Sequence, residues 1–105
     1  MTQKRHPKVG TVYLLWAMDT DRFKIGYSYA GVGKRAAAIS ASSPWPILII
    51  ATKPGRVYDE RTLQLEFSGY RTHREWFALP EPAVWALLDR FGITCKMVHE
   101  KVNAP

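Results

Sequence analysis

The sequence predicts one small domain of the α/β (α+β) class, with a central three-stranded, largely antiparallel sheet flanked by about three helices. Three observations predict it. The chain has 105 residues, which is enough for one hydrophobic core and too few for two. Its apolar fraction of 47% is that of a folded globular protein rather than a disordered one. Short apolar runs with strand character alternate with stretches of helical spacing, and turn-forming residues separate them.

The first two strands are expected to form a hairpin. From Val9 onward alternate side chains point to opposite faces, and both faces are mostly apolar. This strand should therefore be central and covered on both sides. Residues 19–21 carry a turn signal, and residues 22–26 read as the return strand. Residues 27–33 read as a loop.

The rest of the domain supplies the helices and the third strand. An alanine-rich helix is expected first, and prolines at 44 and 46 end it before an apolar strand. Glycines at 69 and 92 mark the ends of the two later helices. The expected elements are helix 34–42, strand 47–51, turn 53–55, helix 56–68, a short strand at 75–77 and helix 83–91. Residues 1–8 read as a basic N-terminal arm, 9–92 as the domain, and 93–105 as a C-terminal strand or tail.

Charge favours a polyanionic partner. Fifteen Lys and Arg residues against nine Asp and Glu give a net charge of +6, and nucleic acid is the commonest polyanion. Many small proteins are basic without such a partner, so charge alone leaves that reading open. No apolar run approaches the roughly 20 residues of a membrane span, and no signal peptide is visible. A single cysteine, Cys95, excludes an intramolecular disulfide, and we expect a cytoplasmic protein with no membrane partner.

Two charged side chains lie on helix faces that should be apolar. In the second helix Glu60 shares a stripe with Leu63 and Phe67, and a carboxylate there is costly unless a cation or a metal ion compensates it. In the first helix Arg35 shares a stripe with Ile39. Without further information, a buried structural ion pair between Arg35 and Glu60 is the simpler interpretation. Tyr13 and Lys24 stand among apolar strand residues, but each alone fits an ordinary strand position.

Taken in order, these residues resemble the phage-type branch of the GIY-YIG nuclease superfamily, also called its meiotically-up-regulated-gene branch. The resemblance runs from Gly10 to Phe77, about two thirds of the chain. It rests on Val-Tyr at 12–13, Lys-Ile-Gly at 24–26, Arg35 followed nine residues later by Pro-Trp-Pro, the helix with Glu60, Leu63 and Phe67, then Arg71 and Glu-Trp-Phe at 75–77. The chain departs from the branch at two places, with Gln64 where His is usual and Tyr27 where Arg or Lys is common. Gln64 cannot take up a proton, so an inactive, binding-only descendant is an alternative.

The resemblance implies a divalent-metal-dependent endonuclease that hydrolyses DNA phosphodiester bonds. Tyr13 would act as general base, Arg35 would stabilise the phosphorane, Lys24 would contact phosphate, and Glu60 would hold one Mg²⁺ or Mn²⁺ ion. A single site would nick one strand of DNA, with RNA as the other substrate to consider.

Binding should come from basic side chains that meet backbone phosphates and read little sequence. Specificity would then need a homodimer or a targeting partner. A nucleic-acid-binding module without activity, and a small phage-type protein-interaction domain, are the alternative functions. The expected phosphate contacts are Lys4, Arg5, Lys8, Lys34, Arg56, Arg71 and Arg74.

Overall fold

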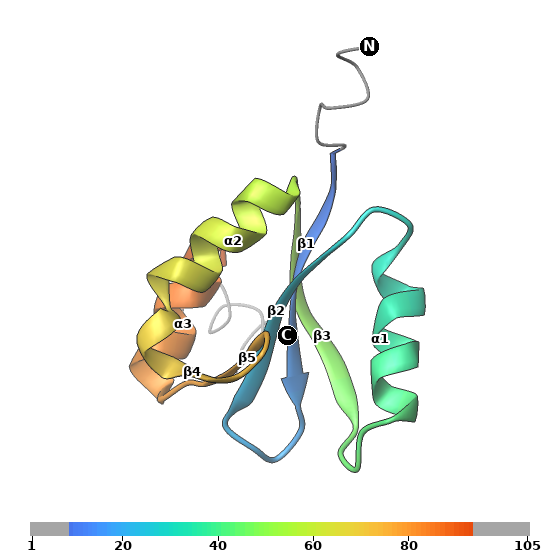
Figure 1. Ribbon diagram of the computed structural model, residues 1–105. Coiled ribbons are helices and arrows are strands. Elements are labelled where there is room, and N and C mark those ends of the chain that lie inside the picture. Colours follow the sequence, from blue (N-terminus) through green and yellow to red (C-terminus); the bar gives the residue numbers. More distant parts are fainter. Residues whose placement is uncertain (1–8, 94–105) are drawn as a thin grey trace, which may run out of the picture.

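A computed structural model describes residues 9–93 and places a sheet between helices on both of its faces (Figure 1). The order along the chain is two strands, a helix, a long strand, a helix, a short hairpin and a last helix. The elements are β1 (Gly10–Ala17), β2 (Arg22–Ser28), α1 (Val32–Ala41), β3 (Ile47–Gly55), α2 (Val57–Glu66), the 3-10 turn η2 (Ser68–Tyr70), β4 (Arg71–His73), β5 (Trp76–Ala78) and α3 (Glu81–Arg90).

The sheet has five strands in the order β3-β1-β2-β5-β4, and every neighbouring pair is antiparallel. The three expected antiparallel strands are present, but the sheet is wider than expected, because the β4–β5 hairpin extends it beyond β2. The short strand expected at 75–77 is β5, and β4 was not expected. Each strand of this hairpin has only three residues, and all three residues of β4 are exposed. Because no side chain of β4 is buried, its sequence has no alternation of polar and apolar residues that would predict a strand.

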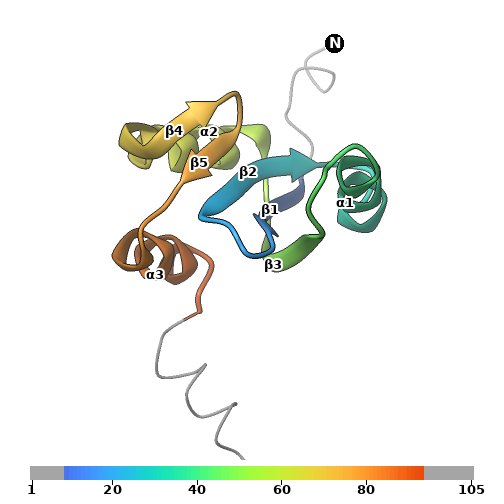
Figure 2. The ribbon, with the colours of Figure 1, turned by 90° about the horizontal axis from the view of Figure 1, so that it is seen from below.

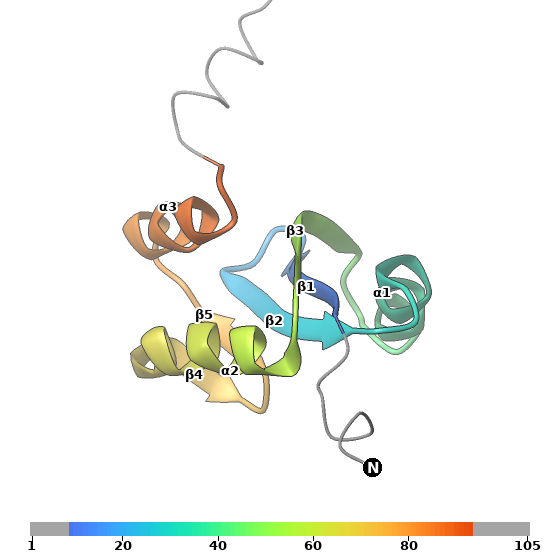
Figure 3. The same ribbon diagram turned by 90° about the horizontal axis from the view of Figure 1, so that it is seen from above.

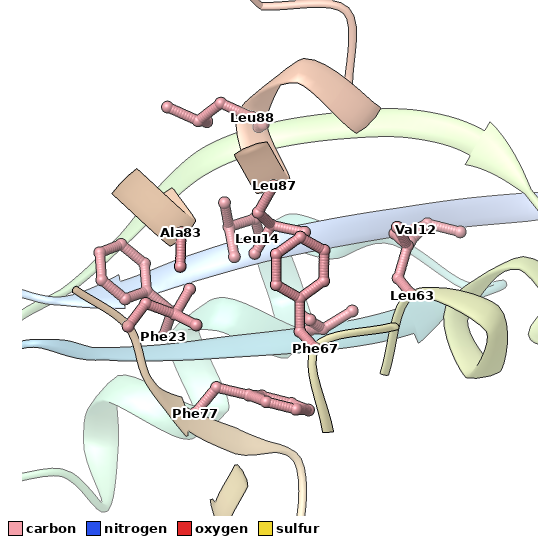
Figure 4. Packing of buried hydrophobic residues seen from close by; sticks show 12 residues of the cluster. Val12, Leu14, Phe23, Leu63, Phe67, Phe77, Ala83, Leu87 and Leu88 are labelled. Atoms are coloured by element: carbon pink, nitrogen blue, oxygen red, sulfur yellow. The ribbon is translucent and has the colours of Figure 1, made fainter. Parts of the chain in front are cut away.

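Helices cover the two faces of the sheet unequally, as the end-on views show (Figure 2 and Figure 3). The larger core lies under α2 and α3, where Leu63, Phe67 and Leu87 pack against Val12 and other strand residues (Figure 4). The smaller core lies under α1 and contains Tyr13, Leu15 and Ala36. Strand β1 thus contributes buried side chains to both layers, as its apolar alternation predicts.

Strand β3 continues to Gly55 and includes the segment 53–55 that the sequence predicts as a turn. That expectation is wrong because β3 is an edge strand, where proline is tolerated. Pro54 lies opposite Thr11 of β1 and continues the strand rather than reversing it.

The three helices are where the sequence places them, with boundaries that differ by a few residues. Helix α1 begins at Val32, two residues early, and α3 begins at Glu81, next to the proline at its start. Helix α2 ends at Glu66, after which a 3-10 turn replaces the expected last turn. No helix in the described part of the chain is long and apolar enough to cross a membrane. The expected basic arm 1–8 and all of the expected C-terminal segment except Ile93 lie outside the described residues.

Candidate active site

The Tyr13 side chain lies across the backbone of the neighbouring strand. Tyr13 of β1 pairs with Gly26 of β2, and a Cβ added at Gly26 would lie 2.3 Å from the Tyr13 ring and from its hydroxyl. The ring therefore occupies the space that any other residue at position 26 would need. Tyr13 is only 1% exposed, so its position is fixed by packing. Glycine at position 26 therefore leaves room for the Tyr13 ring.

Lys24 lies on the same face of the sheet and is held by a carboxylate. Its ammonium Nζ is 2.7 Å from Oε1 of Glu75 and lies over the Trp76 ring at 5.9 Å from the ring centroid. The residue is 8% exposed, which is unusual for a lysine. Contact with a phosphate, as the resemblance implies, would therefore be made by an ammonium that Glu75 already binds.

Glu75 was not predicted as a site residue, although it opens the Glu-Trp-Phe string. It belongs to the two-residue turn between β4 and β5. Arg74 in the same turn has φ 55°, a left-handed conformation that is unfavourable for a residue with a side chain. This turn directs the Glu75 carboxylate toward Lys24, and the Glu75 backbone carbonyl also accepts from Ile25 N–H at 3.3 Å. The hint in the sequence was the position of Glu75 at the start of the Glu-Trp-Phe string.

Glu60 is the second carboxylate of the site. It lies in the first turn of α2, whose start is fixed by the Asp59 side chain accepting from Arg56 N–H at 2.7 Å. Glu60 is 8% exposed, and burial raises the pKa of its carboxyl above the ordinary value. The nearby negative charge of Glu75 raises this pKa further, while Lys24 and Arg61 lower it. Two carboxylates from different elements thus lie close together, Glu60 buried and Glu75 partly exposed.

Arg35 is associated with Tyr13 and not with Glu60. The ion pairs formed among residues 9–93 include none between Arg35 and Glu60, so the interpretation of these residues as a structural ion pair is wrong. Arg35 is exposed on α1, and its guanidinium acts on the Tyr13 hydroxyl as hydrogen-bonding group and as positive charge. Burial nevertheless prevails and raises the pKa of Tyr13 above its ordinary value of 10.0.

Gln64 links the site to the hairpin. Its side-chain Nε2 donates to the backbone carbonyl of Ile25 at 2.8 Å, at the edge of β2 beyond its pairing with β5. Its Oε1 accepts from Nη2 of Arg71 at 3.3 Å. Both ends of the amide are therefore engaged, and Gln64 holds α2, one turn after Glu60, against strand β2. At this position a glutamine performs a structural task that needs no proton transfer.

The basic residues expected to meet phosphates have different surroundings. Lys34 and Arg35 line a shallow depression beside the loop after β2. Arg56 and Arg74 are exposed, at the start of α2 and in the β4–β5 turn. Arg71 is also exposed, but it donates to Gln64 and to the Arg74 carbonyl, and its guanidinium lies 5.5 Å from the Phe77 ring centroid. Lys4, Arg5 and Lys8 lie outside the described residues.

The donor set suits a hard cation with few protein ligands. No group of three His, Cys, Asp or Glu residues capable of holding a metal ion occurs within residues 9–93. Mg²⁺ commonly takes only one or two carboxylates and keeps several waters. Glu60 and Glu75 provide two such oxygens, and their mutual repulsion is what a divalent cation would relieve. The residues present therefore fit a Mg²⁺-type ion and do not fit a zinc centre.

Comparison with known proteins assigns the family. Neither the curated proteins nor the solved structures contain a match to this chain. The model of the T5orf172 domain matches residues 10–92, which include every described residue of the site. That domain is found in phage proteins and in proteins associated with nucleases, and it marks the chain as a phage-type, nuclease-associated or DNA-binding module. The chain belongs to the T5orf172 domain family.

Proposed function

We propose that this protein is a divalent-metal-dependent endonuclease of the GIY-YIG type that hydrolyses phosphodiester bonds in DNA. One observation carries the proposal: a tyrosine hydroxyl, a guanidinium and two carboxylates from separate elements act on one another electrostatically. Burial raises the pKa of Tyr13, Arg35 lowers this pKa, and the negative charges of Glu75 and Glu60 raise it, so all four groups act on one another electrostatically. Glu75 is also in direct contact with Lys24, on the same face of the sheet as Tyr13. A base, an anion-binding donor and ligands for a hard cation are the groups that phosphodiester hydrolysis needs.

Tyr13 is the proposed general base: its phenolate would accept a proton from the attacking water, and its neutral hydroxyl would orient that water. Its buried hydroxyl is protonated at neutral pH, because burial raises the pKa of Tyr13. The Arg35 guanidinium acts against this shift and favours the phenolate. The same guanidinium is exposed and has forked donors suited to the phosphorane oxygens. Arg35 would thus stabilise both charges that develop during the attack.

Glu60 and Glu75 are the proposed ligands of one Mg²⁺ or Mn²⁺ ion. When bound, such an ion supplies Lewis-acid stabilisation of the leaving oxygen. Lys24 would keep Glu75 in place through the 2.7 Å ion pair and would leave the second carboxylate oxygen of Glu75 available. Gln64 would position Glu60 by holding α2 against β2.

Substrate contacts would be made with the nucleic-acid backbone. Exposed Lys34, Arg56 and Arg74 are suited to phosphate contacts, which position a duplex without reading its sequence. We therefore propose a nicking activity in the cytoplasm of a bacterial or phage-infected cell. Sequence preference would depend on a second copy or on a targeting partner.

Incubation of purified protein with supercoiled plasmid tests the function. Nicking is expected with Mg²⁺ or Mn²⁺ and none with a chelator. Glu60→Gln should abolish it, while Glu81→Gln, which removes an exposed carboxylate at the start of α3, should not. A salt-sensitive gel shift without cleavage would reject the nuclease in favour of a binding module. The absence of both cleavage and a gel shift would favour a protein-interaction domain.

A further inference from the structure

A cavity of about 330 Å³ lies on the same face of the sheet as the candidate site, beyond the catalytic groups. It lies between the end of α1 with the turn that follows and the β4–β5 hairpin. Its lining includes Trp45 and Trp76, together with Arg22, His73, Ser42 and Ser43. The volume falls at the lower end of the roughly 300–1,000 Å³ typical of small-molecule sites. No carboxylate lines it, so its charge suits an anionic ligand.

The two tryptophans of this cavity differ from the other two in the chain. The indole N–H of Trp16 donates to the Thr20 carbonyl at 2.7 Å, and that of Trp85 donates to Glu81 at 3.5 Å. In the part of the chain that the structure describes, the indole N–H groups of Trp45 and Trp76 have no such acceptor. Trp45 is also 50% exposed. A large, exposed aromatic face at a cavity is a binding feature more often than a packing feature.

The backbone holds both tryptophans in place before any ligand arrives. Trp45 is flanked by prolines, and its N–H donates to the Ser43 hydroxyl at 3.1 Å. The Pro46 carbonyl accepts from Met18 N–H at 2.9 Å, which fixes this turn to the end of β1. On the other side, the Thr72 hydroxyl donates to the Trp76 carbonyl at 3.1 Å. The hydroxyls of Ser43 and Thr72 thus form hydrogen bonds with the protein backbone. This favours binding of a base by stacking over recognition of one particular base by hydrogen bonds.

We propose that this cavity binds an unpaired nucleobase of a single-stranded segment next to the bond that is cut. Aromatic platforms beside cations are how proteins bind single strands without sequence preference. Arg22 would meet the adjoining phosphate, although it also pairs with exposed Asp21 at 3.1 Å. The inference rests on the proposed function for the position of the cut, and on the cavity alone for the binding.

Geometry fixes the distance between the base and the cut. Tyr13 and Ala17, four residues apart in β1, lie on the same face of this strand, and Ala17 lines the cavity. Four strand residues span about 13 Å, which corresponds to about four stacked nucleotides at roughly 3.4 Å each. Cleavage should therefore fall within about four nucleotides of the junction between single and double strand.

Binding is measured in a chelator with two labelled DNA probes, a blunt duplex and the same duplex with a four-nucleotide single-stranded tail. The parent should bind the tailed duplex about tenfold more tightly, as expected for one stacked base. Trp45→Ala should remove that preference and leave blunt-duplex affinity unchanged, and Trp45→Phe should restore most of it. Tyr58→Ala, which removes an exposed aromatic side chain of α2 outside the cavity, should keep the preference.

Equal binding of both probes by the parent, or an equal loss on both in Trp45→Ala, would overturn the proposal. Because no cleavage is needed, this result is independent of plasmid nicking. A protein that nicks plasmid but ignores the tail loses only this inference. A protein that prefers the tail but never cuts loses the proposed function and the expected position of the cut, and keeps the nucleobase site.

Discussion

Gly26→Ala tests whether the Tyr13 ring is placed by the absence of a side chain opposite it. The new methyl group would lie 2.3 Å from two Tyr13 atoms, where ordinary contact is 3.4–4 Å. The ring would have to move by more than 1 Å, but Tyr13 is 1% exposed and packed against the α1 layer. Such overpacking costs about 1–3 kcal/mol. A domain of this size then loses roughly 5–20 °C in Tm.

Thermal unfolding followed by circular dichroism measures this loss, with Gly33→Ala as the matched control. Gly33 lies in α1 with open space around it, so alanine there should be neutral or stabilise by up to about 1 kcal/mol. A double-mutant cycle with Tyr13→Val makes the test specific, because without the ring the cost of Gly26→Ala should disappear. The same cost in both backgrounds, or no cost in the parent, would refute this account of the Tyr13 position.

Three further outcomes are expected. Tyr13→Phe should reduce nicking by about 10²–10⁴-fold while DNA binding is kept, and full activity in this variant would exclude the base role. The nicking rate of the parent should still rise toward and beyond pH 10, because burial raises the pKa of Tyr13. Glu60→Gln should be more stable than the parent at pH values above the raised pKa of Glu60, and equally stable below the ordinary value of 4.5, because burial penalises ionised Glu60 only in the folded state. Mg²⁺ should raise the Tm of the parent and not of this variant. A Glu60→Gln protein with a lower Tm than the parent at pH 8 would indicate a structural role. Affinity for unrelated duplexes should be similar and fall steeply with salt, and Lys34→Ala should reduce the slope of log affinity against log salt by about one; a salt-insensitive preference for one sequence would contradict backbone binding.

The sequence predicts those parts of the fold that have a strong period. The apolar alternation of β1 and the helical stripes that contain Leu63 and Phe67 identify the core on both sides of the sheet. Strand β5 was predicted as a short strand, but β4 was not predicted, because its three exposed residues have no alternation of polar and apolar side chains to detect. Pro54 was predicted as part of a turn, because proline usually interrupts a strand. A strand accepts proline when it lies at the edge of a sheet, and the edge position of β3 is known only from the tertiary structure.

The candidate site shows the same division. Arg35 and Glu60 could be selected because each is charged on a helix face that should be apolar, whereas Tyr13 and Lys24 were selected through the family resemblance. Their partners could not be selected, since the association of Arg35 with Tyr13, and of Lys24 with Glu75, depends on how α1 and the hairpin lie on the sheet. Glu75 lies in a turn, where a carboxylate is ordinary, so nothing about its immediate neighbours in the sequence indicated its contact with Lys24.

The ion pair between Lys24 and Glu75 bears on the stage of folding at which the proposed site is complete. It joins residues 51 positions apart, and the Gln64 contact with β2 joins residues 39 positions apart. Contacts of such long range form only after loops of that length have closed, which slows folding and delays them relative to local structure. A chain that has made only its β1–β2 hairpin and its helices would hold Tyr13 beside Gly26 but would have no second carboxylate and no fixed Glu60. If the proposed function holds, competence for cleavage should therefore appear only when these long-range contacts have formed, and chains that lack them should be inactive.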